Sequence, residues 1–178
     1  MSGVKPHPLL HTLPCVMEEL CINRSFNTDK ISLGGHGYTL HYDKYFRQLQ
    51  DKEIRILELG VASGGSMRLW ETYFPKAEIY GIDLTADCKK FETVRTKIYI
   101  GDLMNDEFMA KFLQESGGNF DIIIDDACHF EPQISHSLNQ LFPYVKEGGV
   151  YVIEDLFTSY CAGFRGGFRS PGTAIENL

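Results

Sequence analysis

The chain has 178 residues, of which 43% are hydrophobic and 23% are charged, a balance typical of one soluble globular domain with a single core. Its formal net charge of −7 argues against a nucleic-acid partner, because such binding depends on lysine and arginine contacts to phosphates. The first 21 residues lack the apolar core of a signal peptide, and no apolar stretch approaches the roughly 18 residues of a membrane span. We therefore expect a cytoplasmic protein that binds neither nucleic acid nor membranes.

Five cysteines are present, and none forms a C-x-x-C pair. A chain of this length can build a core without covalent links, and an odd number of thiols cannot pair completely. We therefore expect reduced thiols at Cys15, Cys21, Cys88, Cys128 and Cys161.

Five short apolar runs predict the strands of a sheet. Each is rich in isoleucine, valine, leucine or tyrosine, which is typical of a parallel strand covered on both faces. The runs are residues 54–60, 78–84, 97–102, 120–126 and 149–155.

Helical patterns lie between these runs. Apolar side chains recur at helical spacing in residues 66–74, 106–116 and 132–145. Gly148 and Gly149 are expected to end the last helical unit and to begin the last strand. The alternation predicts a doubly wound, mainly parallel α/β sheet.

Every predicted strand ends in an acidic side chain. Ligands of doubly wound sheets bind beyond the carboxyl ends of the strands, so acids there are candidates for a binding site. Any one of them could equally cap a helix or complement its dipole, but this explanation is weaker for all five ends together. The acids are Glu58, Asp83, Asp102, the pair Asp125 and Asp126, and the pair Glu154 and Asp155.

A glycine-rich turn, ELGVASGGS in residues 58–66, follows the first predicted strand. Such a turn before a helix brings a ligand against backbone N–H groups. In the dinucleotide pattern G-x-G-x-x-G, Gly60 and Gly65 fit, but Ala62 replaces the middle glycine that lets the backbone approach a pyrophosphate. The turn therefore counts against NAD or FAD.

The glycine loop Glu58-x-Gly60-x-x-x-Gly64, with Asp83 ending the second strand and Asp102 after the third, resembles the class I S-adenosylmethionine-dependent methyltransferases. Three further segments, residues 27–46, 124–129 and 152–160, are similar to segments of the macrolide sugar O-methyltransferases. A cephalosporin-hydroxylase-like branch shares parts of the pattern. The resemblance, over roughly residues 25–165, implies a Rossmann-like methyltransferase sheet and S-adenosylmethionine as cofactor.

The resemblance also implies how the cofactor would be held. Gly60 would pack against its methionine part, Asp83 would accept hydrogen bonds from the ribose hydroxyls, and Asp102 would lie near the adenine. Residues 27–38 would cover it as a lid, with an ordinary polar turn as the alternative, and Asp125 would face it or cap the turn. The expected contacts are Thr28, Lys30, Tyr38, Glu58, Gly60, Ser63, Asp83, Leu84, Asp102 and Asp125.

A metal site is implied in the same way. The resemblance assigns Asp126, Glu154 and Asp155 to Mg²⁺, with Mn²⁺ or Ca²⁺ as substitutes, and these carboxylates meet if the last two strands are neighbours. A divalent ion can lower the pKa of a bound oxygen and orient it. His129 would be the general base, because histidine titrates near neutral pH, with capping or packing on the next helix as the alternative.

Several nearby residues complete the expectations. His136 is expected to be a surface or packing histidine outside the chemistry. Cys128 is expected to be a small buried residue, with recruitment of zinc as the alternative. Tyr160, Arg165 and Arg169 are candidates for contacting the acceptor.

We divide the chain into an N-terminal leader or helix, a cofactor-covering segment, a methyltransferase core, and a glycine- and arginine-rich tail for which disorder is an open alternative. The ranges are residues 1–24, 25–52, 53–160 and 161–178. No good strand follows Asp155, whereas the class that the chain resembles adds an antiparallel pair there. Further chain or a partner subunit would cover the exposed edge, and we expect a homo-oligomer.

Together these observations favour a metal-dependent O-methyltransferase that uses S-adenosylmethionine and acts on a hydroxyl of a sugar or another small natural product. A cofactor-binding module without turnover, with a role in assembly or regulation, is the alternative. A nicotinamide-dependent oxidoreductase is a third hypothesis, favoured by the α/β pattern and disfavoured by Ala62.

Overall fold

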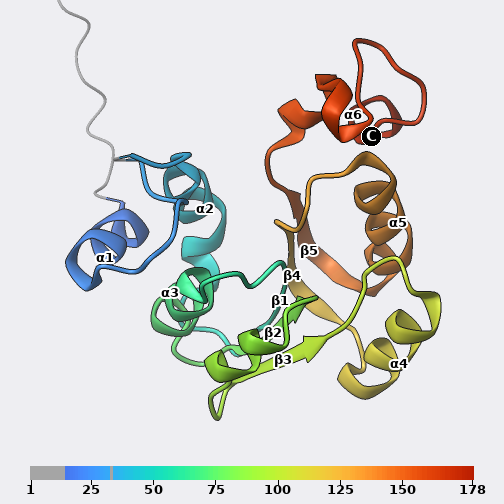
Figure 1. The fold of residues 1–178 in the computed structure, drawn as a ribbon. Coiled ribbons are helices and arrows are strands. Elements are labelled where there is room, and N and C mark those ends of the chain that lie inside the picture. The colour runs from blue at the N-terminus through green and yellow to red at the C-terminus, as the bar shows by residue number, and fades with distance from the viewer. Residues whose placement is uncertain (1–14, 33) are drawn as a thin grey trace, which may run out of the picture.

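The computed structural model describes residues 15–32 and 34–178, in which five parallel strands form one sheet (Figure 1). The strand order is β3-β2-β1-β4-β5, so the chain starts near the middle of the sheet and winds to both sides. This arrangement confirms the predicted doubly wound α/β sheet. The strands are β1 (Arg55–Leu59), β2 (Glu78–Asp83), β3 (Thr96–Ile100), β4 (Phe120–Asp125) and β5 (Val145–Ile153).

Three helices fill the connections that the sequence predicts, α3 (Gly65–Tyr73), α4 (Asp106–Ser116) and α5 (Glu131–Leu141). α4 begins where the Asn105 side chain accepts a hydrogen bond from the Phe108 N–H at 3.1 Å. α5 ends four residues before the predicted boundary at residue 145 and continues as a 3₁₀ turn, because Pro143 has no N–H to extend the helix.

The last strand begins earlier than predicted. β5 starts at Val145 rather than at residue 149, so Gly148 and Gly149 lie inside it. The pairing with β4 is irregular there, since Phe120 pairs with Val145 but Ile122 pairs with Val150. A β-bulge accommodates the extra residues, which the apolar pattern alone did not reveal.

Two helices precede the sheet. α1 (Val16–Arg24) lies in the expected leader or helix, whose residues 1–14 are outside the described part of the chain. α2 (Tyr38–Phe46) was not predicted, because its aromatic residues have only middling helix propensity. It is held by packing on other elements, since Tyr42 meets Trp70 of α3 edge to face with ring centroids 5.5 Å apart.

The core lies on both faces of the sheet. Successive residues of β1 point to opposite faces, so Ile56 packs with α1, α2 and α3 while Leu57 packs with α4. The part of the core around Ile56 includes Met17, Phe46 and Trp70, which come from α1, α2 and α3. The N-terminal helices therefore share one hydrophobic core with the sheet.

The carboxyl ends of β1, β4 and β5 lie side by side. Backbone bonding continues past the strands, because the Asp126 N–H donates to Leu59 O and the Glu154 N–H donates to Asp125 O, each at 3.0 Å. The residues after β4 and β5 are thus fixed beside the loop that follows β1.

The C-terminal segment folds over α5, where Figure 1 shows it at the end of the chain. Glu131, at the start of α5, accepts hydrogen bonds from Ser159 Oγ at 2.6 Å and from the Ala174 N–H, where α6 (Ala174–Asn177) begins. None of the helices in residues 15–32 and 34–178 is long and apolar enough to cross a membrane.

Candidate active site

Two adjoining cavities open at the carboxyl edge of the sheet. The larger, of about 540 Å³, lies between the glycine loop after β1 and residues 27–30. The smaller, of about 360 Å³, is lined by the residues that end β2 and β3. Both are lined by Gly60, Ala62 and Asp126. They therefore form one cleft that crosses the glycine loop.

Seven of the ten predicted cofactor contacts line this cleft, namely Thr28, Lys30, Gly60 and Ser63 in or beside the larger cavity and Asp83, Leu84 and Asp102 in the smaller. Their roles remain predictions. The structure puts them along the path that an elongated ligand would take across the ends of β1, β2 and β3.

Tyr38, Glu58 and Asp125 line neither cavity, contrary to expectation. Glu58 is buried, and its Oε2 accepts a hydrogen bond from Trp70 Nε1 at 2.9 Å. Asp125 and Asp126 are consecutive and point to opposite sides, so only Asp126 reaches the cleft. Asp125 Oδ2 lies 3.4 Å from Gln133 Nε2 of α5, and burial raises the pKa of Asp125 to about 7.

The glycine loop is tied to the end of β2 by Asp83. Its Oδ2 accepts hydrogen bonds from the N–H groups of Val61 and Ala62 at 2.9 and 3.0 Å, and its Oδ1 accepts one from Thr85 at 2.7 Å. Burial alone would raise the pKa of Asp83, but these backbone donors outweigh it and hold the pKa below its ordinary value. Gly60, with φ of +90°, has no room for a Cβ against the Asp126 carbonyl.

Residues 27–30 lie across this loop. Ser63 Oγ donates a hydrogen bond to the Asn27 carbonyl at 3.0 Å, and the same carbonyl is packed so closely on Gly65 that a Cβ there would collide with it. The segment thus forms one wall of the larger cavity, and its role as a lid over the cofactor stays a prediction.

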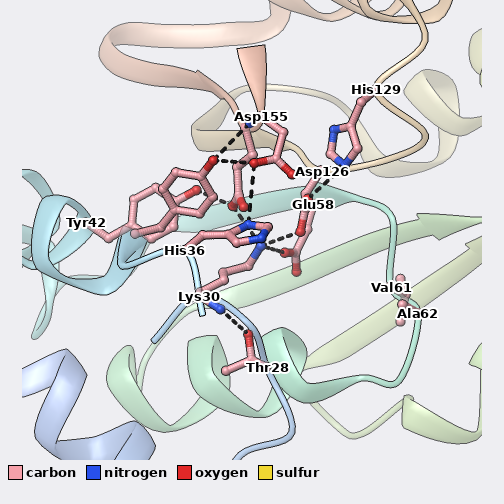
Figure 2. A network of polar contacts seen from close by, with 12 residues as sticks. Thr28, Lys30, His36, Tyr42, Glu58, Val61, Ala62, Asp126, His129 and Asp155 are labelled. Atoms are coloured by element: carbon pink, nitrogen blue, oxygen red, sulfur yellow. Dashed lines mark hydrogen bonds and ion pairs between the residues drawn. The ribbon is translucent and has the colours of Figure 1, made fainter. Parts of the chain in front are cut away.

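The Lys30 side chain is buried among carboxylates instead of lying at the surface of the cavity (Figure 2). It is 1% exposed, and Nζ donates hydrogen bonds to Asp126 Oδ2 and, at 2.7 Å, to Glu154 Oε1. Nζ is also 3.4 Å from Glu58 Oε1, an ion-pair contact rather than a hydrogen bond. Burial alone would lower the pKa of Lys30, but the three carboxylates outweigh it and raise the pKa. The ammonium is therefore charged and bound to carboxylates.

Glu154 and Asp126 form the centre of this cluster. Burial raises the pKa of Glu154 to about 7, with Lys30 opposing the shift and Asp126 adding to it. Burial likewise raises the pKa of Asp126, although Lys30 opposes it. Tyr42 also donates a hydrogen bond to Glu154 Oε1.

Asp155 is held from the other side by Tyr38. Tyr38 Oη donates a hydrogen bond to Asp155 Oδ1 at 2.5 Å and accepts one from the Asp155 N–H at 3.1 Å. His36 Nδ1 lies 3.4 Å from the same Oδ1. Tyr38 therefore supports a predicted metal ligand and is not in contact with the cleft.

His129 faces these carboxylates across the cleft. Its Nε2 is 3.7 Å from Asp126 Oδ1 and 3.5 Å from Asp155 Oδ2, and it lines the larger cavity. His129 and Asp155 both have left-handed backbones, with φ of +54° and +52°. Such conformations cost energy in residues other than glycine and cluster at functional sites.

The chemistry of the three predicted metal ligands fits a hard divalent ion, because all are carboxylates. In residues 15–32 and 34–178, no three His, Cys, Asp or Glu side chains close around a common point as a finished metal cage. Lys30 lies between Asp126 and Glu154, and their remaining oxygens are the donors that a metal would use.

Other predicted neighbours are accounted for. Cys128 is exposed and lines the smaller cavity, so the expectation that it is buried is wrong. His136 Nε2 is 3.3 Å from Asp106 Oδ1 of α4, outside the cleft. The Arg165 guanidinium stacks 5.0 Å from the Phe130 ring.

Sequence reasoning missed Tyr42 and His36, which contact the carboxylate cluster (Figure 2). A signal for Tyr42 was present, since Tyr38, Tyr42 and Phe46 recur every four residues and so share one face of a helix. No comparable pattern marks His36.

Comparison with known proteins gives close relatives, although no family model matches the chain. The chain is 39% identical over 154 residues to mycinamicin VI 2''-O-methyltransferase of Micromonospora griseorubida. This match covers 80% of the chain and 38% of that protein. The chain is also 41% identical over 144 residues to demethylmacrocin O-methyltransferase of Streptomyces fradiae, covering 77% and 36%. The chain thus spans less than half the length of these relatives.

A solved structure of the MycE methyltransferase from the mycinamycin pathway, in complex with Mg, SAH and mycinamycin VI, superposes with a TM-score of 0.82 at 35% identity. The match covers 91% of this chain and 46% of that one. The described sheet and helices therefore have the Rossmann-like fold of that methyltransferase.

Proposed function

We propose that this chain, a homologue of the macrolide sugar O-methyltransferases, carries the cofactor site and metal site of an S-adenosylmethionine-dependent O-methyltransferase that acts on a sugar hydroxyl of a natural product. One observation carries the proposal most strongly. The cleft at the glycine loop is lined by Asp126 and His129, while the predicted ligand Glu154 shares the Lys30 ammonium with Asp126 and Asp155 Oδ2 lies 3.5 Å from His129 Nε2.

The two cavities suit the two ends of the cofactor. Gly60 and Ser63 would hold its methionine part in the larger cavity, with Thr28 covering it. Asp83, Leu84 and Asp102 would hold the ribose and adenine in the smaller one. A carboxylate offers about four lone-pair positions, and three of those on Asp83 accept backbone N–H groups, so one is left for a ribose hydroxyl. When bound, S-adenosylmethionine supplies a methyl group on a sulfonium that leaves as a neutral thioether.

The carboxylates Asp126, Glu154 and Asp155 would hold Mg²⁺, with Mn²⁺ or Ca²⁺ as substitutes. The ion would supply orientation of the acceptor and a lower pKa of its hydroxyl. Support comes from the hard oxygen donors and from the Mg present in the MycE complex.

His129 would take the proton of the acceptor hydroxyl on Nε2. An imidazole is suited to this step, because it changes charge near neutral pH. Its Nε2 lies 3.7 Å from Asp126 Oδ1 and 3.5 Å from Asp155 Oδ2, which places this base beside the carboxylates that would hold the ion.

The test has a binding arm and a turnover arm. We expect calorimetry to detect S-adenosylmethionine binding to the chain, and methyl transfer to mycinamicin VI, the acceptor named for a relative, to require Mg²⁺. Asp126→Asn and Glu154→Gln should abolish metal-dependent transfer while cofactor binding persists, and His129→Ala should slow transfer most at neutral pH. Absence of cofactor binding, or unchanged turnover in all three variants, would refute the proposal.

A homo-oligomeric, cytoplasmic protein completes the proposal. In the described residues β5 is bonded only to β4, and natural proteins usually cover such an edge. The five cysteines are unpaired, as is usual in a reducing compartment. Light scattering on the purified chain tests the first point, and a monomer at all concentrations would contradict it.

A further inference from the structure

Each of the three predicted metal ligands is gripped by one of its two carboxylate oxygens. Asp126 Oδ2 accepts a hydrogen bond from Lys30, Glu154 Oε1 accepts from Lys30 and Tyr42, and Asp155 Oδ1 accepts from Tyr38. All three donors come from residues 30–42, a segment to which sequence reasoning gave only contacts with the cofactor.

The second oxygens of Asp126 and Asp155 face His129 instead. Asp126 Oδ1 and Asp155 Oδ2 both lie within 3.7 Å of His129 Nε2, on the side of the general-base candidate. Asp126 and Asp155, which follow β4 and β5, therefore each keep one oxygen on the side of His129, while the other oxygen is held by Lys30 or Tyr38.

We propose that Lys30, Tyr38 and Tyr42 are positioning residues that hold one oxygen of each carboxylate and so leave the other available to a divalent cation. This inference rests on the proposed function, because it assumes that Asp126, Glu154 and Asp155 are the ligands. Groups that orient ligands from a second layer typically change metal affinity 10–100-fold when they are removed.

Lys30 neutralises only part of the negative charge of the carboxylate cluster. Glu58, Asp126, Glu154 and Asp155 bring up to four negative charges, against one ammonium. With all four carboxylates ionised, three negative charges remain that a divalent cation could neutralise. Lys30 also lowers the mutual repulsion of the carboxylates, which would otherwise push them apart.

The experiment measures Mn²⁺ binding to the full chain by electron paramagnetic resonance, without cofactor or acceptor. We expect Tyr42→Phe and Tyr38→Phe each to weaken binding about 10-fold, since each removes one hydroxyl without changing charge. Lys30→Met should weaken it by at least as much, because two ligands lose their shared donor.

Tyr73→Phe is the matched control. Tyr73 is fully buried, and its hydroxyl donates a 2.7 Å hydrogen bond to Asp43, a carboxylate of α2 outside the cluster. Tyr42→Phe and Tyr73→Phe should lower the melting temperature alike, but only Tyr42→Phe should weaken Mn²⁺ binding.

The outcomes separate the two proposals. If the parent chain binds Mn²⁺ and Asp126→Asn abolishes binding while the tyrosine variants bind like the parent, the positioning role is overturned and the metal site stands. Tighter binding by Lys30→Met would show that the ammonium competes with the metal, which also overturns it. If the parent chain binds no Mn²⁺, the metal site itself fails, and the positioning role with it.

Discussion

Asp83 links the glycine loop to β2 before any ligand arrives, because its carboxylate accepts three backbone N–H groups. In Asp83→Asn, an amide NH₂ group takes the place of one carboxylate oxygen. A donor then faces a backbone N–H donor, and that hydrogen bond is lost. We expect this substitution to lower the free energy of unfolding by about 1–3 kcal/mol at pH 7 without cofactor. Urea unfolding measures this, with the exposed Asp87→Asn as the matched control.

The pH dependence of that loss has a defined sign. The folded pKa of Asp83 is held below its ordinary value of 3.8, so its stabilisation is present above that pH and is lost as the pH falls through the lower folded value. The gap between the parent chain and Asp83→Asn should therefore shrink only below about pH 4. A gap that closes between pH 8 and 6 would contradict this assignment.

Cys128 offers a direct probe of the smaller cavity, because it is exposed and lines it. Cys21 is buried, and burial raises its pKa to about 12, so it should resist alkylation. We expect iodoacetamide to label Cys128, and S-adenosylhomocysteine to protect it in proportion to occupancy. Mass spectrometry of the peptides measures both.

Cys161 is the internal control for that experiment, since it is half-buried and outside both cavities. Its labelling should not respond to S-adenosylhomocysteine. Equal protection of both thiols, or none at Cys128, would remove the smaller cavity as the adenosine site.

At the residue scale, the sequence predicts which acids stand at the sheet edge but not how each side chain is used. Asp126 reaches the cleft, whereas Asp125 points into the protein, a choice that depends on the face of β4 that α5 covers. Lys30 and Glu154, which form a hydrogen bond, are 124 positions apart in the sequence, and no local pattern predicts such a contact.

At the scale of elements, the contact between residues 27–30 and the glycine loop depends on Gly65. Gly65 lies at the start of α3, where Ala would normally stabilise a helix, but a Cβ there would collide with the Asn27 carbonyl. Gly65→Ala should therefore displace residues 27–30, weaken S-adenosylmethionine binding and speed proteolysis in that segment. Calorimetry and limited proteolysis measure the two effects.

Gly163→Ala is its control, because nothing lies within 4 Å of a Cβ at Gly163. It should leave both properties unchanged. If Gly65→Ala binds the cofactor like the parent chain, residues 27–30 do not contribute to cofactor binding through this contact.

The elements themselves were largely predictable where they are long and regular. α3 and α4 match their predicted ranges closely, because their apolar side chains follow helical spacing. α2 was not predicted, because its stability comes from contacts with α1 and the sheet. An argument from helix propensity does not include such contacts. Most of the donors that hold the carboxylates lie on α2 or just before it.

At the scale of the whole molecule, strand and helix alternation was enough to predict the parallel sheet and the edge at which the cleft opens. It did not predict that α1 and α2 pack on the core, since such contacts join distant parts of the chain. Trp70, the chain's single tryptophan, lies in that packing and reports on it.

Phe46→Ala tests whether α2 is part of the cooperative unit. Phe46 is 1% exposed and packs against Phe74 with ring centroids 6.2 Å apart. We expect a loss of about 3–5 kcal/mol in unfolding free energy, with coincident transitions by Trp70 fluorescence and circular dichroism. Phe142→Ala, at a residue that is 59% exposed, should change stability by less than about 0.5 kcal/mol. An unchanged main transition in Phe46→Ala would mean that α2 is a separate appendage, and the donors on it could not then hold the carboxylates rigidly.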